Sequence, residues 1–106
     1  MAELPVEIEN TIRRYIAQVS QLKQVSRAYL YGSYAKGTAG KWSDIDVAII
    51  SPDFSPDLFE ERVFLMKLAL KLDDRIEPSP FRPEDFELDN PLVHEISTSG
   101  IEISTE

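Results

Sequence analysis

The chain has 106 residues, of which 42% are hydrophobic and none is cysteine, and its formal net charge is −8. This length allows a single domain, residues 1–106, and the lack of cysteine excludes disulfides, thiolate metal sites and a cysteine nucleophile. The acidic balance argues against direct nucleic-acid binding, but not against a small nucleotide carried with Mg²⁺, because the metal supplies positive charge locally. The opening sequence MAELPVEIEN lacks the features of a signal peptide, and no run approaches the ~18 apolar residues of a membrane span. We therefore expect a cytoplasmic protein without membrane contact.

The first half of the chain alternates between helix and strand patterns. From Pro5 to about Lys23, apolar residues recur three and four positions apart, which predicts an amphipathic helix packed on a sheet. The apolar run Ala28–Tyr31 predicts a buried strand, and Ile45–Ile50 predicts a second one. The segment between these two strands is the most informative part of the sequence.

Glycines and carboxylates mark that segment. Gly32-Ser33 breaks the first strand, and Tyr34–Lys36 is expected to form one helical turn capped by Gly37. Asp44 and Asp46 stand where the second strand begins and share one of its faces, about 6.6 Å apart along the chain. Two carboxylates aimed at one point beside a Gly-Ser turn are costly unless a cation neutralises them. The pattern therefore predicts a metal-assisted nucleotide site.

The second half predicts further helices and short strands. A helix is expected from Ser55, as its N-cap, to Leu72, and its apolar residues cover more than one face, so it is either buried on two sides or offers a spare face to another subunit. Residues 73–77 predict a turn into a short strand stopped by Pro78 and Pro80. The remaining expected elements are a helical turn at Pro83–Phe86, a helix at Pro91–Thr98 with Leu92, Val93 and Ile96 inward and Gly100 as its stop, and an edge strand at Ile101–Ile103. This alternation predicts an α/β or α+β fold with one mixed sheet.

Several phosphate and metal motifs are excluded by their spacing. Gly32 and Gly37 are spaced as in a Walker A loop, but Thr38 stands where its lysine belongs. A calcium loop opening at Asp44 lacks the next ligand and the required glycine. His94 is the only histidine, which excludes a multi-histidine zinc site.

One motif survives these exclusions. Gly32-Ser33, ten intervening residues and Asp44-Ile45-Asp46 give the pattern G-S-x10-D-x-D, within the flanking text GSYAKG and SDIDVAII. In this the chain resembles the minimal, MNT-type members of the nucleotidyltransferase superfamily, whose palm domain is shared with DNA polymerase β. The resemblance implies a polymerase β palm-like fold, with a small mixed sheet and flanking helices, and transfer of a nucleotide.

The resemblance also implies a carboxylate triad that is both catalytic and metal-binding. Asp44 and Asp46 would hold two Mg²⁺ ions about 3.5–4 Å apart, which bracket the attacking and leaving oxygens. A third carboxylate is expected on a neighbouring strand, where it would bind one metal and help to deprotonate the acceptor hydroxyl. Glu77 is the candidate, and Asp73 and Asp74 are its rivals.

Contacts to the triphosphate are expected around the Gly-Ser turn. Gly32 and Ser33 open a helical turn, so their backbone amides suit phosphate oxygens, and the Ser33 hydroxyl can add a hydrogen bond. Lys36 and Ser43 are candidate phosphate contacts, with surface solvation and turn capping as the alternatives. Lys41 is a further candidate. The nearby Trp42 would either stack on a base or pack against the loop.

The function implied by the resemblance is Mg²⁺-dependent transfer of a nucleoside monophosphate, AMP from ATP, to a hydroxyl of another molecule. Larger superfamily members carry a helical domain for the acceptor, which we do not expect in this chain, so the acceptor would come from a partner or a second copy. Similar MNT-type proteins are often antitoxins that silence a helical HEPN-type RNase by attaching AMP to a tyrosine. Two rivals remain: a non-enzymatic module that binds nucleotide or neutralises a partner by contact, and a small-molecule transferase.

Overall fold

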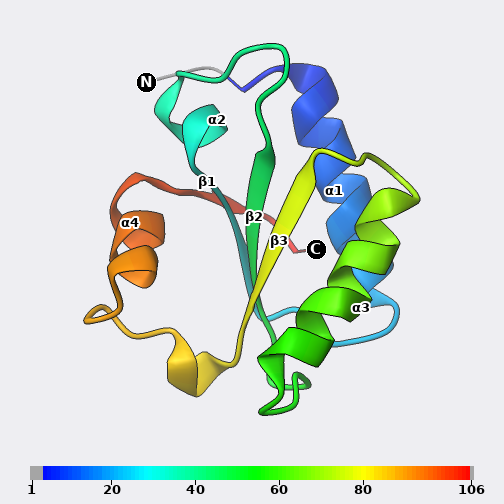
Figure 1. Ribbon diagram of the computed structural model, residues 1–106, viewed down its shortest axis with the longest axis vertical. Helices are drawn as coiled ribbons and strands as arrows, with labels where there is room; N and C mark the ends of the chain where they lie inside the picture. Colours follow the sequence, from blue (N-terminus) through cyan, green and yellow to red (C-terminus); the bar gives the residue numbers. More distant parts are fainter. Residues whose placement is uncertain (1–3, 106) are drawn as a thin grey trace.

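The computed structural model describes residues 4–105 and shows a four-stranded sheet with helices on both faces (Figure 1). The elements in chain order are α1 (Val6–Ser20), β1 (Arg27–Tyr31), α2 (Ser33–Lys36), β2 (Ile45–Ile50), α3 (Leu58–Leu70), β3 (Ile76–Phe81), the 3₁₀ turn η1 (Pro83–Asp85), α4 (Pro91–Ser99) and β4 (Ile101–Ile103). The strand order is β3-β2-β1-β4. Since β2 pairs antiparallel with β1 but parallel with β3, the sheet is mixed, and the predicted fold class is confirmed.

Side-chain alternation along the strands divides the core into two layers. Leu30, Val47 and Ile76 belong to the larger layer, which α1 and α3 cover. There the buried Tyr15 hydroxyl of α1 donates a hydrogen bond of 2.8 Å to the Leu65 carbonyl of α3. Residues on the opposite face, among them Ile50, pack against α4 and against Phe86, which follows η1, in a smaller layer. By strand alternation, Asp46 of β2 points to this same face as Ala48 and Ile50.

The strand β3 runs through both of its prolines, so the expected stop at Pro78 is wrong. Hydrogen bonds from the Ile45 and Ser51 amides to the carbonyls of Arg75 and Phe81 show that odd-numbered β3 residues face β2. Pro78 and Pro80 therefore direct their nitrogens toward the open edge of the sheet, where no donor is needed. An edge strand accepts proline at every second position, where the backbone nitrogen points away from the neighbouring strand. The sequence pattern does not say which positions these are.

Helix boundaries differ from the expected ones by a few residues. α3 begins at Leu58, because the Asp57 carboxylate, and not Ser55, caps it by accepting a hydrogen bond of 3.1 Å from the Glu60 amide. α3 then ends at Leu70, two residues early. α1 ends at Ser20 rather than Lys23. The helical turn at 83–85, the helix from Pro91 and the strand Ile101–Ile103 are confirmed, although Leu92 is exposed rather than inward.

A nearly buried carboxylate ties the loop after α1 to α3. Glu61 lies 2.9 Å from the Lys23 ammonium and accepts a hydrogen bond of 2.8 Å from the Ser55 amide. Burial by itself would raise the pKa of Glu61, but the Ser55 and Lys23 contacts outweigh it and lower the pKa below the ordinary value of 4.5. The contribution of this group to stability is therefore complete above pH 4.5 and is lost as the pH falls through the folded-state pKa.

Replacing Glu61 with glutamine should destabilise the fold by about 1–3 kcal/mol at neutral pH, because Lys23 loses its partner and the Ser55 amide a charged acceptor. Urea unfolding at pH 7 and in acid measures the free energy of unfolding. The difference in this free energy between Glu61→Gln and wild type should shrink in acid. Glu87→Gln, an exposed change, is the matched control. Equal unfolding midpoints for Glu61→Gln and wild type at pH 7 would contradict the assignment.

Candidate active site

The turn between β1 and α2 requires glycine at position 32. Its backbone has φ 75° and ψ −149°, which side-chain-bearing residues rarely adopt. A Cβ atom placed on Gly32 would also lie 2.2 Å from Oδ2 of Asp46. The backbone of the Gly-Ser turn therefore lies directly against the Asp46 carboxylate. The four-residue helix α2 follows and ends at Gly37 in the left-handed conformation, as expected.

The strand register brings the three predicted acids to one end of the sheet. Asp46 is paired with Glu77 across the parallel β2–β3 ladder, so the two side chains leave the same face of neighbouring strands, about 4.8 Å apart. Asp44 lies two residues before Asp46, just outside β2, and is exposed, whereas Asp46 is partly buried. The rival acid Asp73 is held by Arg75 through a 2.8 Å ion pair, and the other rival, Asp74, lines a hollow together with Asp44.

Several acidic side chains lie near Asp46, and no ion pair of Asp46 with a lysine or arginine is found among residues 4–105. Burial raises the pKa of Asp46, and the negative charges of Asp44, Glu77 and Glu95 raise it further. Glu77 faces the Arg62 guanidinium of α3 at 3.5 Å. Within residues 4–105, no three His, Cys, Asp or Glu side chains stand close enough together to hold one metal ion as they are placed.

The donor set nevertheless suits Mg²⁺. The acids near Asp46 offer carboxylate oxygens, which hard divalent cations prefer, and the negative charges of Asp44, Glu77 and Glu95 add to burial in raising the pKa of Asp46. Asp44 and Asp46 would hold the metal. Glu77 would join them only by exchanging Arg62 for the ion.

The other predicted nucleotide contacts make the following interactions within the chain. Lys36, at the end of α2, lies 3.6 Å from the Glu95 carboxylate of α4. The Ser43 hydroxyl accepts a 2.8 Å hydrogen bond from the Gly40 amide, so in this structure it caps the loop turn. Contact of Gly32, Ser33, Lys36 or Ser43 with a nucleotide stays a prediction.

Comparison with known proteins gives the family. Residues 12–93 match the model of the nucleotidyltransferase domain. This chain belongs to that family. The enzyme class predicted from the sequence, a nucleotidyltransferase, is thereby confirmed.

Solved structures of similar fold include members of toxin–antitoxin pairs. A crystal structure of a toxin–antitoxin with AMP-PNP has a chain 27% identical to this nucleotidyltransferase domain, with a TM-score of 0.64 over 91% of this chain and 72% of that one. A mutant MntA–HpeT toxin–antitoxin is 25% identical, with a TM-score of 0.62 and the same coverages, 91% and 72%. A complex of tri-AMPylated Shewanella oneidensis HEPN toxin with MNT antitoxin is 24% identical, with a TM-score of 0.57 over 92% and 70%. No curated protein sequence matches the chain.

Sequence reasoning missed two residues of this site. Glu95, on α4, adds negative charge beside Asp46 and contacts Lys36. Tyr31 is the register partner of Asp46 on β1, and its hydroxyl lies 2.8 Å from the Ser79 hydroxyl. Burial raises the pKa of Tyr31, and Asp46 and Glu95 raise it further, against the lowering effect of Ser79. Strand alternation could have placed Tyr31 on the Asp46 face, but no local signal points to Glu95.

A hollow of about 570 Å³ is lined by Lys41, Trp42, Asp44, Asp74 and Arg75. Trp42 is 84% exposed, with the Lys41 ammonium 5.2 Å from its ring centroid, so packing against the loop, one of the two alternatives for Trp42, is wrong. The exposed indole ring could stack on a base, and the two cations, Lys41 and Arg75, carry charge that suits phosphate groups.

None of the helices among residues 4–105 has the length and apolar character needed to span a membrane.

Proposed function

We propose that this nucleotidyltransferase domain moves AMP from ATP to a hydroxyl group of a helical HEPN-type partner protein, and so acts as the antitoxin of a toxin–antitoxin pair. The observation that carries the chemical part is the Asp46 carboxylate, which lies against the Gly32 backbone beside two further acids. This arrangement would place backbone amides that suit phosphate oxygens next to carboxylates that could hold Mg²⁺. The similar toxin–antitoxin with AMP-PNP and the complex containing an AMPylated HEPN toxin support the nucleotide and the acceptor.

The residues divide the work as follows. Bound Mg²⁺ would supply the positive charge that offsets the triphosphate and the charge developing during transfer. Asp44 and Asp46 would hold it, and the amides of the Gly32-Ser33 turn would bind phosphate oxygens. The acceptor oxygen would form a bond to the α-phosphorus while the bond to pyrophosphate breaks. Lys36 would bind the triphosphate, and Glu77 would both bind one metal and take the proton of the acceptor hydroxyl.

The proposal is tested with ATP labelled at the α-phosphate, Mg²⁺ and the protein that copurifies with this chain from its native host. Label should move to the partner, and the Asp44→Asn/Asp46→Asn double variant should move none while keeping the wild-type circular dichroism spectrum. Mass spectrometry of the partner then identifies the modified hydroxyl. If the double variant still neutralises the partner and wild type moves no label, the domain acts by contact and the proposal is wrong.

Replacing Glu77 with glutamine should raise the Mg²⁺ concentration needed for half-maximal transfer by more than tenfold, because one metal ligand loses its charge. Arg62→Gln is the matched control, since it breaks the same 3.5 Å ion pair but removes no ligand. The control should need no more Mg²⁺ than wild type. If both variants raise the requirement equally, Glu77 serves to orient Arg62 and is not a metal ligand.

A further inference from the structure

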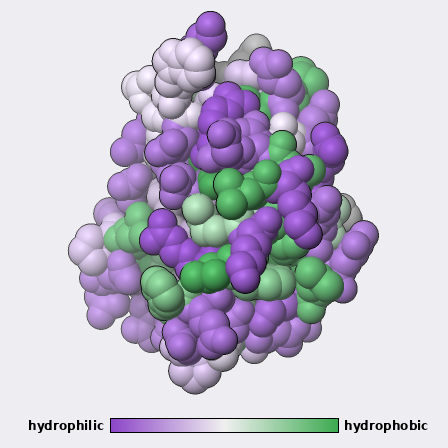
Figure 2. All heavy atoms as spheres, turned by 45° about the vertical axis from the view of Figure 1, so that its right-hand side comes forward, coloured by the Kyte–Doolittle hydropathy of each residue, from purple (hydrophilic) through white to green (hydrophobic). Residues whose placement is uncertain are grey.

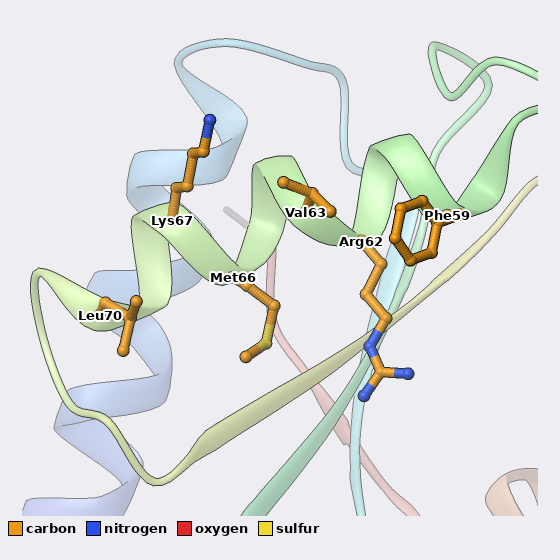
Figure 3. Close-up of a pocket in the computed structure, with 6 residues that line it drawn as sticks. All are labelled: Phe59, Arg62, Val63, Met66, Lys67 and Leu70. Atoms are coloured by element: carbon orange, nitrogen blue, oxygen red, sulfur yellow. The ribbon is translucent and has the colours of Figure 1, made fainter.

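An apolar groove runs along the outer face of α3, and one of its lining residues, Arg62, also forms the ion pair with Glu77 of the candidate active site. Phe59, Arg62, Val63, Met66, Lys67 and Leu70 line this pocket of about 270 Å³ (Figure 3). Phe59 is 78% exposed and Leu70 63% exposed, although both are large hydrophobic residues. Green apolar atoms lie among purple polar ones on the molecular face that includes α3 (Figure 2). Some apolar side chains of α3 therefore face solvent rather than the sheet.

The four apolar groove residues follow the spacing of a helix-pairing seam. Phe59, Val63, Met66 and Leu70 are separated by four, three and four positions, as residues d, a, d and a of a heptad are. The inner side of the same helix is formed by other residues, such as the buried Leu65 and Ala69. α3 therefore has one apolar side for its own sheet and a separate seam that suits a second helix.

The charges beside the seam favour one partner. We propose that the groove binds α3 of a second copy of this chain, with the two helices antiparallel about a two-fold axis that passes between Val63 and Met66. Val63 then meets Met66 of the second copy. At the flanks, Glu60 lies opposite Lys67 of the second copy, and the symmetry repeats this pair. The proposed interface is therefore self-complementary: apolar residues meet apolar residues along the seam, and opposite charges meet at its flanks.

Two further observations favour this antiparallel arrangement. In a parallel pair, Arg62 would face Lys67 of the second copy, which is repulsive. Moreover, the whole chain carries a net charge of −8, and two copies should repel each other over most of their surface. The charged residues of α3 are Glu60, Glu61, Arg62 and Lys67, two acidic and two basic, so this helix is neutral overall. The charge of α3 itself therefore does not oppose self-association.

The interface is small. One helix pair buries less than the ~1,200 Å² of a standard specific interface, so we expect a dissociation constant in the micromolar range. Sedimentation equilibrium of the full chain from low micromolar to submillimolar concentrations should show a monomer–dimer equilibrium. Met66→Glu should leave only monomer, because it places two carboxylates at the two-fold axis. Leu88→Glu adds the same charge at an exposed leucine outside the groove, and should dimerise like wild type.

A charge exchange separates this proposal from a non-specific apolar contact. Glu60→Lys and Lys67→Glu should each weaken dimerisation by more than threefold, and the Glu60→Lys/Lys67→Glu double variant should restore it, because both symmetric pairs are then complementary again. These side chains are exposed, so the fold should tolerate all three variants. A wild-type chain that stays monomeric throughout, a dimer unaffected by Met66→Glu, or a double variant without rescue would each overturn the proposal. Dimerisation of the chain alone does not depend on its transferase activity.

Discussion

Replacing Gly32 with alanine is expected to slow nucleotidyl transfer by about 100-fold and to destabilise the protein. The backbone at this position has φ 75°, and holding a side-chain-bearing residue there costs about 1–3 kcal/mol. The added Cβ would also lie 2.2 Å from Oδ2 of Asp46, so either the turn or the carboxylate must move. A shift of about 1 Å in such a site costs on the order of 100-fold in rate. Thermal unfolding and the labelled-ATP transfer reaction measure the two effects.

The loop offers a matched control. An alanine Cβ at Gly40 would meet no atom within 4 Å, and the Gly40 backbone does not have a positive φ. Gly40→Ala should therefore leave transfer unchanged and unfolding within about 0.5 kcal/mol of wild type. If Gly32→Ala and Gly40→Ala behave alike, the close approach of the turn to Asp46 has no functional importance.

Replacing Asp46 with asparagine should remove activity and yet stabilise the metal-free protein at neutral pH. The carboxylate is partly buried near Asp44, Glu77 and Glu95, which raises its pKa above the ordinary 3.8. A group with a raised folded-state pKa disfavours folding once it ionises, so asparagine, of similar shape and uncharged, relieves that cost. Nucleotidyl transfer should fall by at least about 1,000-fold, because catalysis of phosphoryl-type transfer depends mainly on metal ions that neutralise the charge of the phosphates.

The pH dependence gives this second prediction its sign. Below pH 3.8 the carboxyl is protonated in the folded and unfolded states, so Asp46→Asn and wild type should unfold alike. As the pH rises through the folded-state pKa, wild type should lose stability relative to the variant, and the gap should then stay constant to pH 7. Mg²⁺ should stabilise wild type more than the variant. Asp89→Asn, at an exposed position, is the control, and an Asp46→Asn protein less stable than wild type at pH 7 would contradict the assignment.

Local patterns in the sequence were sufficient for much of the fold. The strand Ile45–Ile50 has the predicted bounds, and Gly37 ends α2 as predicted, because alternation and left-handed glycine caps depend on neighbouring residues alone. The start of α3 was misplaced because Ser55 and Asp57 are both good caps, and in the folded chain Asp57 caps the helix while the Ser55 amide binds the Glu61 carboxylate. β3 was cut short because proline is excluded from a strand only where its nitrogen must donate.

The sequence by itself determined the family, the Gly-Ser turn and the Asp44–Asp46 pair, since all lie within one short motif whose spacing is visible in the text. Only the tertiary structure decided which distant acids surround that pair. The parallel register of β2 and β3 sets Glu77 beside Asp46, the packing of α4 adds Glu95, and the groove side of α3 supplies Arg62 to Glu77. Charges act through space, so residues far apart in sequence become neighbours only when the sheet and its helices are assembled.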